Sequence, residues 1–282
     1  MKKITRRSFM AAAGLTVAAL ALTACGGSSS TASSAAASSV ASSAAASSEA
    51  ASAAATELTT VEAGKLTMAT NAAFPPYEMT TDAGEFEGID IETAQAIADK
   101  LGLELQIDDM DFDAALLSVQ QGKADIVMAG VTVTDERKAV MDFSDSYATG
   151  IQSIIVPEGS DITSPDDLAG KKIGTQRGTT GYIYCSDDFG DDAVVAYDDG
   201  LTAVQALNNG QVDAVVIDNA PAKEFVAANP GLVILDTSYA EEDYAIGLAK
   251  GSALEDAVNA ALEELKADGT LQSIVDKYIN AE

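Results

Sequence analysis

The stretch LLSVQQGKADIVMAGV (residues 116–131) decides the fold, because the chain repeats its pattern as VQALNNGQVDAVVIDN (residues 204–219). Gly122 aligns with Gly210, and in both copies an aspartate and a run of apolar residues follow. A helix pattern, a glycine and a short apolar strand in succession are typical of α/β folds. The repeat predicts two similar halves, although unrelated strand–helix units also resemble one another by chance.

The register of the repeat indicates where a ligand site lies. It places Gly130 opposite Asp218, each at the C-terminal end of its predicted strand. In open α/β sheets, ligands bind outside the carboxyl ends of the strands. Two such half-sites predict two lobes that face one cleft.

Strand and helix patterns alternate from residue 65 onward, apart from a predicted loop at 71–79. Expected strands cover 65–70, 103–109, 124–130, 171–176, 193–199, 212–219, 232–236 and 243–251, and the stretch 142–157 is expected to be extended and to cross into a new part of the fold. Expected helices cover 88–102, 112–122, 180–189, 200–210, 220–230, 252–269 and 270–280. Strands separated by helices of this length predict an α/β architecture with mostly parallel sheets.

The first 24 residues predict an export signal peptide. Four basic side chains within the first seven residues precede roughly 14 apolar and small residues, fewer than a membrane span needs. The segment LTAC (22–25) resembles a bacterial lipobox, which implies that Cys25 becomes the lipid-modified first residue. A cleaved signal with an unmodified cysteine is the alternative, and the paired arginines leave the Sec and twin-arginine routes open.

Residues 25–60 predict a disordered linker that follows the lipidated cysteine. This stretch is rich in Ser, Ala and Gly and has almost no large apolar residue, so it cannot bury a core. As a flexible coil it would span about 30–35 Å, which suits a tether. The roughly 220 residues that remain are enough for one large domain or two lobes.

The charge of the chain excludes some partners. The net charge is −28, and it becomes −32 once the four basic residues of the signal are removed. Such a surface repels nucleic acid and anionic lipid head groups, so we expect no nucleic-acid partner and membrane attachment only through the lipid on Cys25. Cys185 then has no partner for a disulfide.

Arg137 stands out because it and Arg177 are the only arginines after the predicted signal. Thr134 reads as a helix N-cap followed by two acids, which places Arg137 in the first turn. The helix dipole disfavours a cation there. Chance is one explanation, and a bound carboxylate, held by helix-terminal N–H groups and the guanidinium fork, is the other.

The second half of the chain supplies the other half of this expected site. The stretch GTQRGTTG (174–181), with Gln176, Thr179 and Thr180, follows a strand and opens a helix, so its N–H groups could meet the same carboxylate. Asp218 could pair with an ammonium group or cap the helix that follows it. An anion site opposite a cation site is what a free α-amino acid needs.

Phe74 and Phe112 are two of only seven phenylalanines, and both lie in polar surroundings. An aromatic pair could sandwich the side chain of a ligand. The alternative is that each ring anchors its loop to the core.

Several motifs in this order resemble the amino-acid-binding proteins of bacterial ABC importers, the family-three extracellular solute-binding proteins. The resemblance covers nearly all of the chain from residue 61. The motifs that carry it are KLTMATNAAFPPYE (65–78), the run from MDFDAALL to DFSDSY (110–147), KKIGTQRGTTG (171–181) and VDAVVIDNAPA (212–222).

The resemblance implies a two-lobed α/β fold of the type II periplasmic-binding-protein kind, with two crossing strands as hinge. One lobe would comprise 61–147 and 246–282, and the other 148–245. The crossings would lie near 148–152 and 242–245. The lobes would close on the ligand by hinge motion.

The resemblance also implies roles for the candidate residues. Arg137 would grip the ligand carboxylate, helped by Thr132 and by the amides of Gly130 and Thr180. Asp218 would hold the ammonium. The ligand-binding residues implied are Asn71, Phe74, Phe112, Ala129, Gly130, Thr132, Arg137, Gln176, Thr179, Thr180 and Asp218.

The same resemblance bears on the side chain of the ligand. The Ala129 carbonyl would assist at the ammonium, the two phenylalanines would stack on the side chain, and Asn71 and Gln176 would face its tip. Two amides predict a polar, neutral amino acid, while Glu78 leaves a cationic ligand such as arginine or lysine open. Arg177 gains no role and is expected at the surface.

An enzyme is the alternative class. The chain has no histidine, which removes the usual general base, the Ser-His triad and the commonest metal ligand. Some proteins with this fold are dehydratases of cyclic substrates, so an enzyme resembling cyclohexadienyl dehydratase stays open. We expect no metal or cofactor. The sequence predicts a monomeric, lipid-anchored receptor on the outer face of the cell membrane that delivers an amino acid to a permease.

Overall fold

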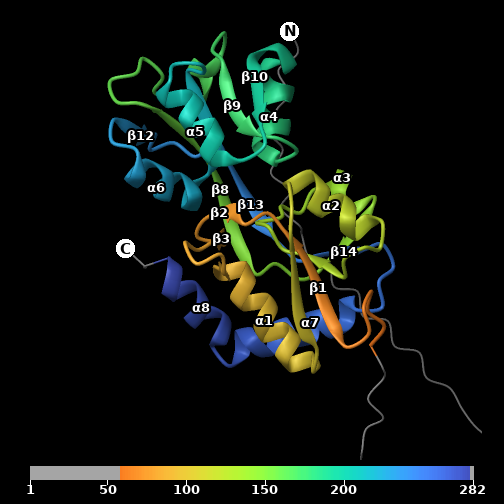
Figure 1. Ribbon diagram of the computed structural model, residues 1–282. Helices are drawn as coiled ribbons and strands as arrows, with labels where there is room; N and C mark the ends of the chain where they lie inside the picture. The colour runs from red at the N-terminus through yellow and green to blue at the C-terminus, as the bar shows by residue number, and fades with distance from the viewer. Residues whose placement is uncertain (1–57, 280–282) are drawn as a thin grey trace, which may run out of the picture. The chain divides into compact units, whose positions relative to one another are not determined.

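Two mixed β-sheets organise residues 58–279, the part of the chain that the computed structural model describes. The order of the first sheet is β5-β1-β6-β14-β7, and that of the second is β10-β9-β11-β8-β12, with β13 also paired to β8. Each sheet and its helices form one lobe, and β8 and β13 run between the lobes (Figure 1). The predicted signal, Cys25 and most of the predicted linker lie outside the described residues.

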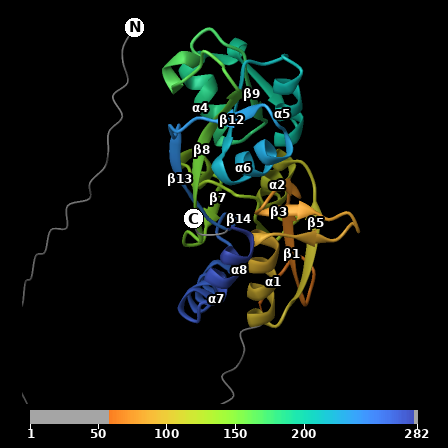
Figure 2. The ribbon, with the colours of Figure 1, turned by 90° about the vertical axis from the view of Figure 1, so that its left-hand side faces the viewer.

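The first lobe begins and ends the described part of the chain. Its strands are β1 (Lys65–Thr70), β5 (Glu104–Asp109), β6 (Ile126–Val127), β7 (Met141–Phe143) and β14 (Gly247–Ala249). Its helices are α1 (Ile89–Leu101), α2 (Phe112–Gln120), the single turn α3 (Asp135–Lys138), α7 (Glu255–Ala267) and α8 (Thr270–Tyr278). The last two pack against each other and against α1, so the C-terminal segment completes this lobe (Figure 2).

The second lobe comes from the middle of the chain. Its strands are β8 (Ala148–Pro157), β9 (Ile173–Gln176), β10 (Val194–Tyr197), β11 (Ala214–Asp218), β12 (Leu232–Ile234) and β13 (Ala240–Tyr244). Its helices are α4 (Thr180–Phe189), α5 (Gly200–Asn208) and α6 (Asn219–Ala228), with short 3₁₀ turns at Pro165–Leu168 and Asp191–Ala193.

The sequence repeat is also a structural repeat. Gly122 and Gly210 both have φ of 66°, a conformation that favours glycine, and both follow the end of a helix. Asp125 and Asp213 each accept a backbone hydrogen bond from the neighbouring strand region, at 2.8 and 2.7 Å. The strand after each aspartate pairs in parallel, β6 with β1 and β11 with β9. Matching hydrogen bonds in both halves favour a true repeat over a chance similarity.

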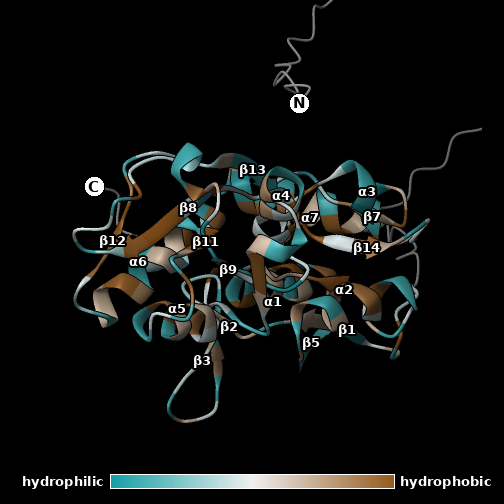
Figure 3. Cartoon of the chain, turned by 90° about the horizontal axis from the view of Figure 1, so that it is seen from above, coloured by the Kyte–Doolittle hydropathy of each residue, from teal (hydrophilic) through white to brown (hydrophobic). Residues whose placement is uncertain are grey.

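The ten-residue strand β8 is an interior strand of the second sheet, with β11 on one edge and β12 and β13 on the other. Residues 152–156 are buried, as expected for a strand that has partners on both edges. Figure 3 shows hydrophobic colour along most of this strand. In the described residues no helix combines the length and the apolar character that crossing a bilayer requires.

The two crossing strands are tied to each other where they leave the first lobe. β8 and β13 pair antiparallel from Ala148 opposite Tyr244 to Gln152 opposite Ala240. The Tyr147 N–H donates to the Tyr244 carbonyl at 2.9 Å. The Tyr244 ring lies so close to β8 that a Cβ added at Gly150 would sit 2.5 Å from it.

Three expectations about the fold were wrong in detail. Residues 71–79, predicted as a loop, contribute to a small three-stranded sheet of β2 (Ala73–Phe74), β3 (Glu78–Thr80) and β4 (Phe86–Glu87). The sheets are mixed, because β7, β8, β12, β13 and β14 all make antiparallel pairs. The single strand predicted at 243–251 is two strands, since the chain leaves β13 at residue 244 and enters β14 in the other sheet at 247.

Candidate ligand-binding site

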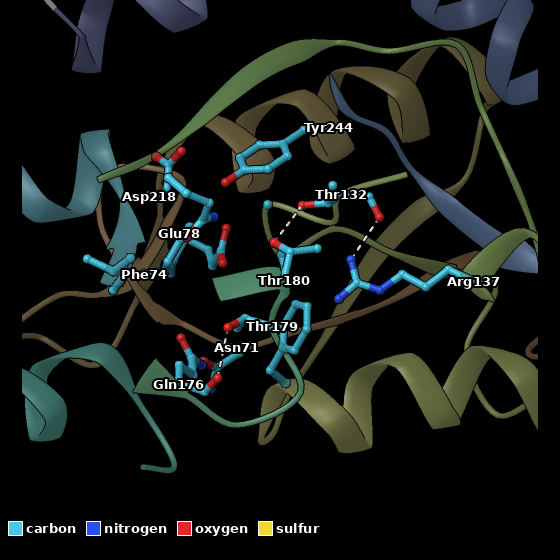
Figure 4. Close-up of a pocket in the computed structure, with 15 residues that line it drawn as sticks. Asn71, Phe74, Glu78, Thr132, Arg137, Gln176, Thr179, Thr180, Asp218 and Tyr244 are labelled. Carbon is cyan, nitrogen blue, oxygen red and sulfur yellow. Dashed lines mark hydrogen bonds between the residues drawn. The ribbon is translucent and has the colours of Figure 1, made fainter. Parts of the chain in front are cut away.

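A cavity with an empty volume of about 390 Å³, its mouth included, lies between the two lobes (Figure 4). All eleven residues predicted from the sequence line it, so the structure brings them together. Four further residues complete the lining: Glu78, Gln152, Ile217 and Tyr244. The ligand-binding roles of these residues stay predictions.

Arg137 enters the cavity from α3. The Thr134 hydroxyl accepts a hydrogen bond from the Arg137 backbone N–H at 3.1 Å, so the predicted N-cap is present. The guanidinium donates to two backbone carbonyls, of Thr132 at 2.7 Å and of Gly178 at 3.1 Å. Its carbon also lies 5.4 Å from the centre of the Phe112 ring. These contacts hold the guanidinium in place between the lobes.

The charge of Arg137 has no counter-ion within ion-pair distance among residues 58–279. The side chain is buried, and this burial lowers its pKa, with carboxylates further away opposing the effect. A buried charge that contacts only carbonyl dipoles is under-compensated. An anion in the cavity would supply the missing charge.

The N-terminus of α4 faces the same cavity. The Thr179 hydroxyl caps the helix by accepting from the Tyr182 N–H at 3.3 Å. Thr180, the first helical residue, is buried and lines the cavity. The N–H groups of a first helical turn carry partial positive charge. Together with Arg137 they form the anion-attracting side of the site.

Asp218 lies at the opposite side of the cavity from Arg137 (Figure 4). Its carboxylate accepts from the backbone N–H groups of Ala220 at 3.0 Å and Ile151 at 2.7 Å, so it caps α6 and also lines the cavity. Burial raises its pKa to about 6, against the lowering effect of these hydrogen bonds. No ion pair to Asp218 exists among the described residues, and an ammonium group would favour its charged form.

Glu78 is the main feature of the site that sequence patterns only hinted at. It is completely buried in the cavity wall, and neither carboxyl oxygen has a hydrogen-bond partner in the described part of the chain. Burial, followed by the nearby charge of Asp90, raises the pKa of Glu78 well above its usual value. Two adjacent buried carboxyl groups cannot both ionise without a cation.

Asp90 supports the cavity wall from α1. One oxygen accepts from the Gly130 N–H at 3.0 Å and the Tyr147 hydroxyl at 2.8 Å, while the other has no partner in the described residues. Burial raises the pKa of Asp90 to about 6, and these two hydrogen bonds limit the rise.

The role implied for the Gly130 amide is therefore wrong. Its N–H donates to Asp90 behind the wall and is not available to a ligand carboxylate. Gly130 still shapes the cavity, since its φ is 54° and an added Cβ would lie 3.0 Å from the Phe74 ring.

Asn71 and Gln176 contact each other across the cavity. The Gln176 amide nitrogen donates to the Asn71 amide oxygen at 2.9 Å. The Thr132 and Thr180 hydroxyls also meet across the lobes, at 3.4 Å. With the bond from Arg137 to the Gly178 carbonyl, these contacts hold the lobes in a closed arrangement.

The aromatic pair is packed in the core and also faces the cavity, so stacking on a ligand stays a prediction. Phe74 lies in β2 and stacks on Tyr77 with centroids 5.9 Å apart, and Phe112 is the first residue of α2. Both rings are buried and line the cavity. Phe74 lies in a strand where a loop was predicted, and Phe112 begins the helix that was predicted there. Arg177, in contrast, is exposed and lies 3.5 Å from Asp198, outside the cavity.

Gln152 and Tyr244 were missed because they carry no motif. Both lie in the crossing strands, where one face of each strand turns toward the cavity. Gln152 and Thr132 both donate to the Glu242 carboxylate at 3.0 Å. Only the pairing of β8 with β13, which joins residues about 90 positions apart, brings these side chains together.

Comparison with known proteins agrees with this geometry. The L-cystine-binding protein TcyJ of Escherichia coli K12 is 34% identical over 226 residues, which cover 78% of this chain and 85% of TcyJ. The arginine-binding extracellular protein ArtP of Bacillus subtilis is 32% identical over 230 residues, which cover 77% of this chain and 87% of ArtP. The solved arginine-, lysine-, histidine-binding protein ArtJ of Geobacillus stearothermophilus superposes with a TM-score of 0.74 at 34% identity, covering 77% of this chain and 96% of ArtJ.

The family match extends over almost the whole folded part. Residues 66–281 match the family described as bacterial extracellular solute-binding proteins, family 3. The two lobes, the two crossing strands and the cavity between them fit that description. The chain belongs to the bacterial extracellular solute-binding proteins of family 3.

Proposed function

We propose that the protein binds an L-amino acid between its lobes and delivers it to the permease of an ABC importer. One observation carries this proposal: Arg137 and Asp218 are both buried in one cavity, have opposite charges and have no ion-pair partner among residues 58–279. The carboxylate and ammonium of an amino acid would compensate both charges at once. TcyJ, ArtP and ArtJ are all named as amino-acid-binding proteins.

Within this class we propose a basic amino acid, L-arginine or L-lysine. The neutral ligand expected from Asn71 and Gln176 loses support, because these two amides bond to each other. Glu78 has no partner in the described residues. With Glu78 ionised, Arg137, Asp218 and Glu78 give the cavity a formal charge of −1, which a cationic side chain would balance. ArtP and ArtJ are named for arginine.

We propose that the lobes move about the two crossings. In this proposal residues 61–147 and 246–282 form one unit, residues 148–245 the other, and the segments near 148–152 and 242–245 flex. The ligand would bind to one open lobe, and closure would add the contacts from the other. The paired strands β8 and β13 support this choice, since they join the lobes without a long linker.

The family is extracytoplasmic. For this chain we propose that residues 1–24 are removed as a signal peptide, that Cys25 carries the lipid, and that the segment up to residue 60 tethers a monomeric receptor to the outer face of the membrane. Labelling of the expressed protein with a radioactive fatty acid tests this. Cys25→Ala is expected to abolish the label and release the protein.

The proposal treats the ligand as unchanged by the protein. An enzyme resembling a cyclic-acid dehydratase is the other candidate for this fold, whereas the relatives named above are binding proteins. The two differ in one observable. A binding protein returns its ligand intact, so proton NMR of L-arginine after prolonged incubation is expected to show no new signals.

Thermal unfolding in the presence of each amino acid tests the proposal. The chain from residue 55 onward forms one compact unit and is the material to use, after unfolding and refolding to remove carried-over ligand. A ligand at 1,000 times its Kd adds about 4 kcal/mol, which is roughly 8–16 °C for a protein of this size.

Two arginine variants provide a matched comparison. Arg137→Ala is expected to lose the shift, and Arg177→Ala, which changes the exposed arginine outside the cavity, is expected to keep it. The absence of a shift with every amino acid would contradict the proposed function.

A further inference from the structure

One pair of amide side chains joins the lobes through a buried contact. Asn71 follows β1 of the first lobe, and Gln176 ends β9 of the second. Their exposed fractions are 8% and 3%. The Gln176 amide nitrogen donates to the Asn71 amide oxygen at 2.9 Å (Figure 4).

Each amide is oriented by its own lobe. The Asn71 amide nitrogen donates to the Met110 carbonyl at 3.0 Å, and that of Gln176 donates to the Asp198 carbonyl at 3.4 Å. A carbonyl only accepts, so each NH₂ group must face it. This leaves the oxygen of Asn71 to meet the nitrogen of Gln176. The donor and the acceptor are thus set before the lobes meet.

The pair occupies equivalent places in the structural repeat. β1 pairs in parallel with β6 of the first repeat, and β9 pairs in parallel with β11 of the second. Asn71 and Gln176 therefore lie at the carboxyl ends of corresponding strands and meet where the two halves face each other.

The groups that form the contact between the lobes already have their partners. The two hydrogens of the Gln176 amide nitrogen have acceptors in Asn71 and Asp198, and the Asn71 oxygen has its donor. Arg137 and Asp218, in contrast, keep uncompensated charges. The amide pair resembles a completed contact between lobes, whereas the charged residues await a partner.

We propose that Asn71 and Gln176 form a latch that stabilises the closed arrangement of the lobes to the same extent for every ligand. They act as positioning residues, because they hold the second lobe over the ligand and do not select its side chain. The binding test of this inference rests on the proposed function, and the test without ligand does not.

The binding test compares Asn71→Ala, Gln176→Ala and the double variant with the unchanged protein. Loss of one hydrogen bond of about 1 kcal/mol corresponds to about fivefold in Kd. Each single variant is expected to weaken the binding of L-arginine, L-lysine and L-glutamine by the same factor, mainly through faster dissociation. The double variant is expected to equal the single ones, since they remove one contact.

Unequal factors among the three amino acids would overturn the latch, because a residue that contacts the tip of the side chain would discriminate between them. Gln176→Glu is a sharper variant of nearly the same shape. It replaces the donor by a carboxylate oxygen that faces two acceptors. We therefore expect a larger loss of affinity than in Gln176→Ala. Arg177→Ala, which changes the exposed residue next to Gln176, is the control and is expected to leave every Kd unchanged.

The second test measures lobe separation without ligand. Spin labels at Lys123→Cys on the first lobe and Asp187→Cys on the second report the distance between two exposed sites. Cys185 does not compete for label, because it is buried and burial raises its thiol pKa to about 12.

The ratio of the short-distance population to the long-distance population is expected to fall about fivefold in Asn71→Ala and Gln176→Ala. Unchanged melting temperatures would show that both variants are folded. Equal ratios, or no short-distance population in the unchanged protein, would overturn the latch. This result is obtained even if none of the amino acids binds. Failure of the latch is therefore distinguishable from failure of the proposed function.

Discussion

Glu78 and Asp90 show how burial alone creates a demand for a ligand cation. Three of their four carboxyl oxygens are buried without a hydrogen-bond partner in the described residues. Burial favours the protonated form of both, since it raises the pKa of each. A cation placed against Glu78 would favour the ionised form instead. Binding of the proposed basic ligand would therefore be coupled to loss of the Glu78 proton.

We predict that a basic ligand binds more weakly at pH 5 than at pH 8. At low pH the ligand must displace the proton of Glu78, and this cost disappears once the pH exceeds the raised pKa of that residue. Calorimetric titration with L-arginine in buffers of different ionisation enthalpy measures both the affinity and the released proton. Glu78→Gln, which cannot titrate, is expected to bind weakly at both pH values, and a pH-independent affinity in the unchanged protein would contradict the coupling.

Asp90→Asn is predicted to stabilise the ligand-free protein at neutral pH. The folded pKa of about 6 lies above the unfolded value of 3.8, so the stability that Asp90 contributes is present below pH 3.8 and lost as the pH rises through 6. At pH 7 the ionised Asp90 therefore lowers the free energy of unfolding by at most about 3 kcal/mol. Asparagine keeps an acceptor for Gly130 and Tyr147 and turns its NH₂ toward Glu78.

Urea unfolding at pH 4 and pH 7 checks this prediction. The gain from Asp90→Asn is expected at pH 7 and should almost vanish at pH 4. Asp90→Ala removes the acceptor for two buried donors and is expected to destabilise at both pH values. Destabilisation of Asp90→Asn at pH 7 would show that the ionised carboxylate is better satisfied than its contacts indicate.

The sequence predicted Arg137 and Asp218 as site residues because each stands out locally. Arg137 is a cation in the first turn of a helix, and Asp218 ends an apolar strand. Glu78 has no such local signal. Its burial depends on the small sheet of β2, β3 and β4 and on α1, which contacts β3 and β4. Tertiary packing of this kind cannot be inferred from neighbouring residues.

The crossing strands β8 and β13 are the elements about which the proposed lobe movement would occur. Tyr244 ends β13, is almost completely buried and packs against Gly150 of β8. The contact leaves no room for a side chain at residue 150. The glycine thus permits the close approach of the two strands.

We predict that Gly150→Val destabilises the protein by about 1–3 kcal/mol, the usual cost of overpacking. The valine would have to displace the Tyr244 ring, which also lines the cavity, so weaker ligand binding is expected as well. Chemical unfolding and calorimetry measure the two effects. Thr149→Val, at the exposed neighbouring position, is the control, and equal behaviour of the two variants would contradict the packing argument.

Elements with clear periodicity were predictable from the sequence. The helices α1, α2, α5 and α7 appear close to their predicted positions, because their apolar residues recur at helical spacing and glycines follow α1 and α2 closely. The strands β2 and β4 have two residues each, too few to show alternation. The antiparallel pairs of β14 join segments more than 100 residues apart, which no local pattern can indicate.

At the scale of the whole molecule, two similar halves place opposite charges in one cavity. The repeat gives each lobe a helix, a glycine turn and a strand whose end reaches the cleft. The first half contributes Arg137, and the second contributes Asp218 and the N-terminus of α4. In the proposed function the lobes close to bring these groups around one small molecule, and this would link ligand capture to movement about β8 and β13.

The measurement that tests this account most directly is calorimetric titration of the unchanged protein and Arg137→Ala with L-arginine and agmatine, which is arginine without its carboxylate. If Arg137 binds the carboxylate, the unchanged protein is expected to prefer L-arginine by at least about 30-fold. In Arg137→Ala this preference is expected to fall below about tenfold, since the partner of the carboxylate is gone. Equal binding of the two ligands by the unchanged protein, or the same preference in both proteins, would contradict the central claim.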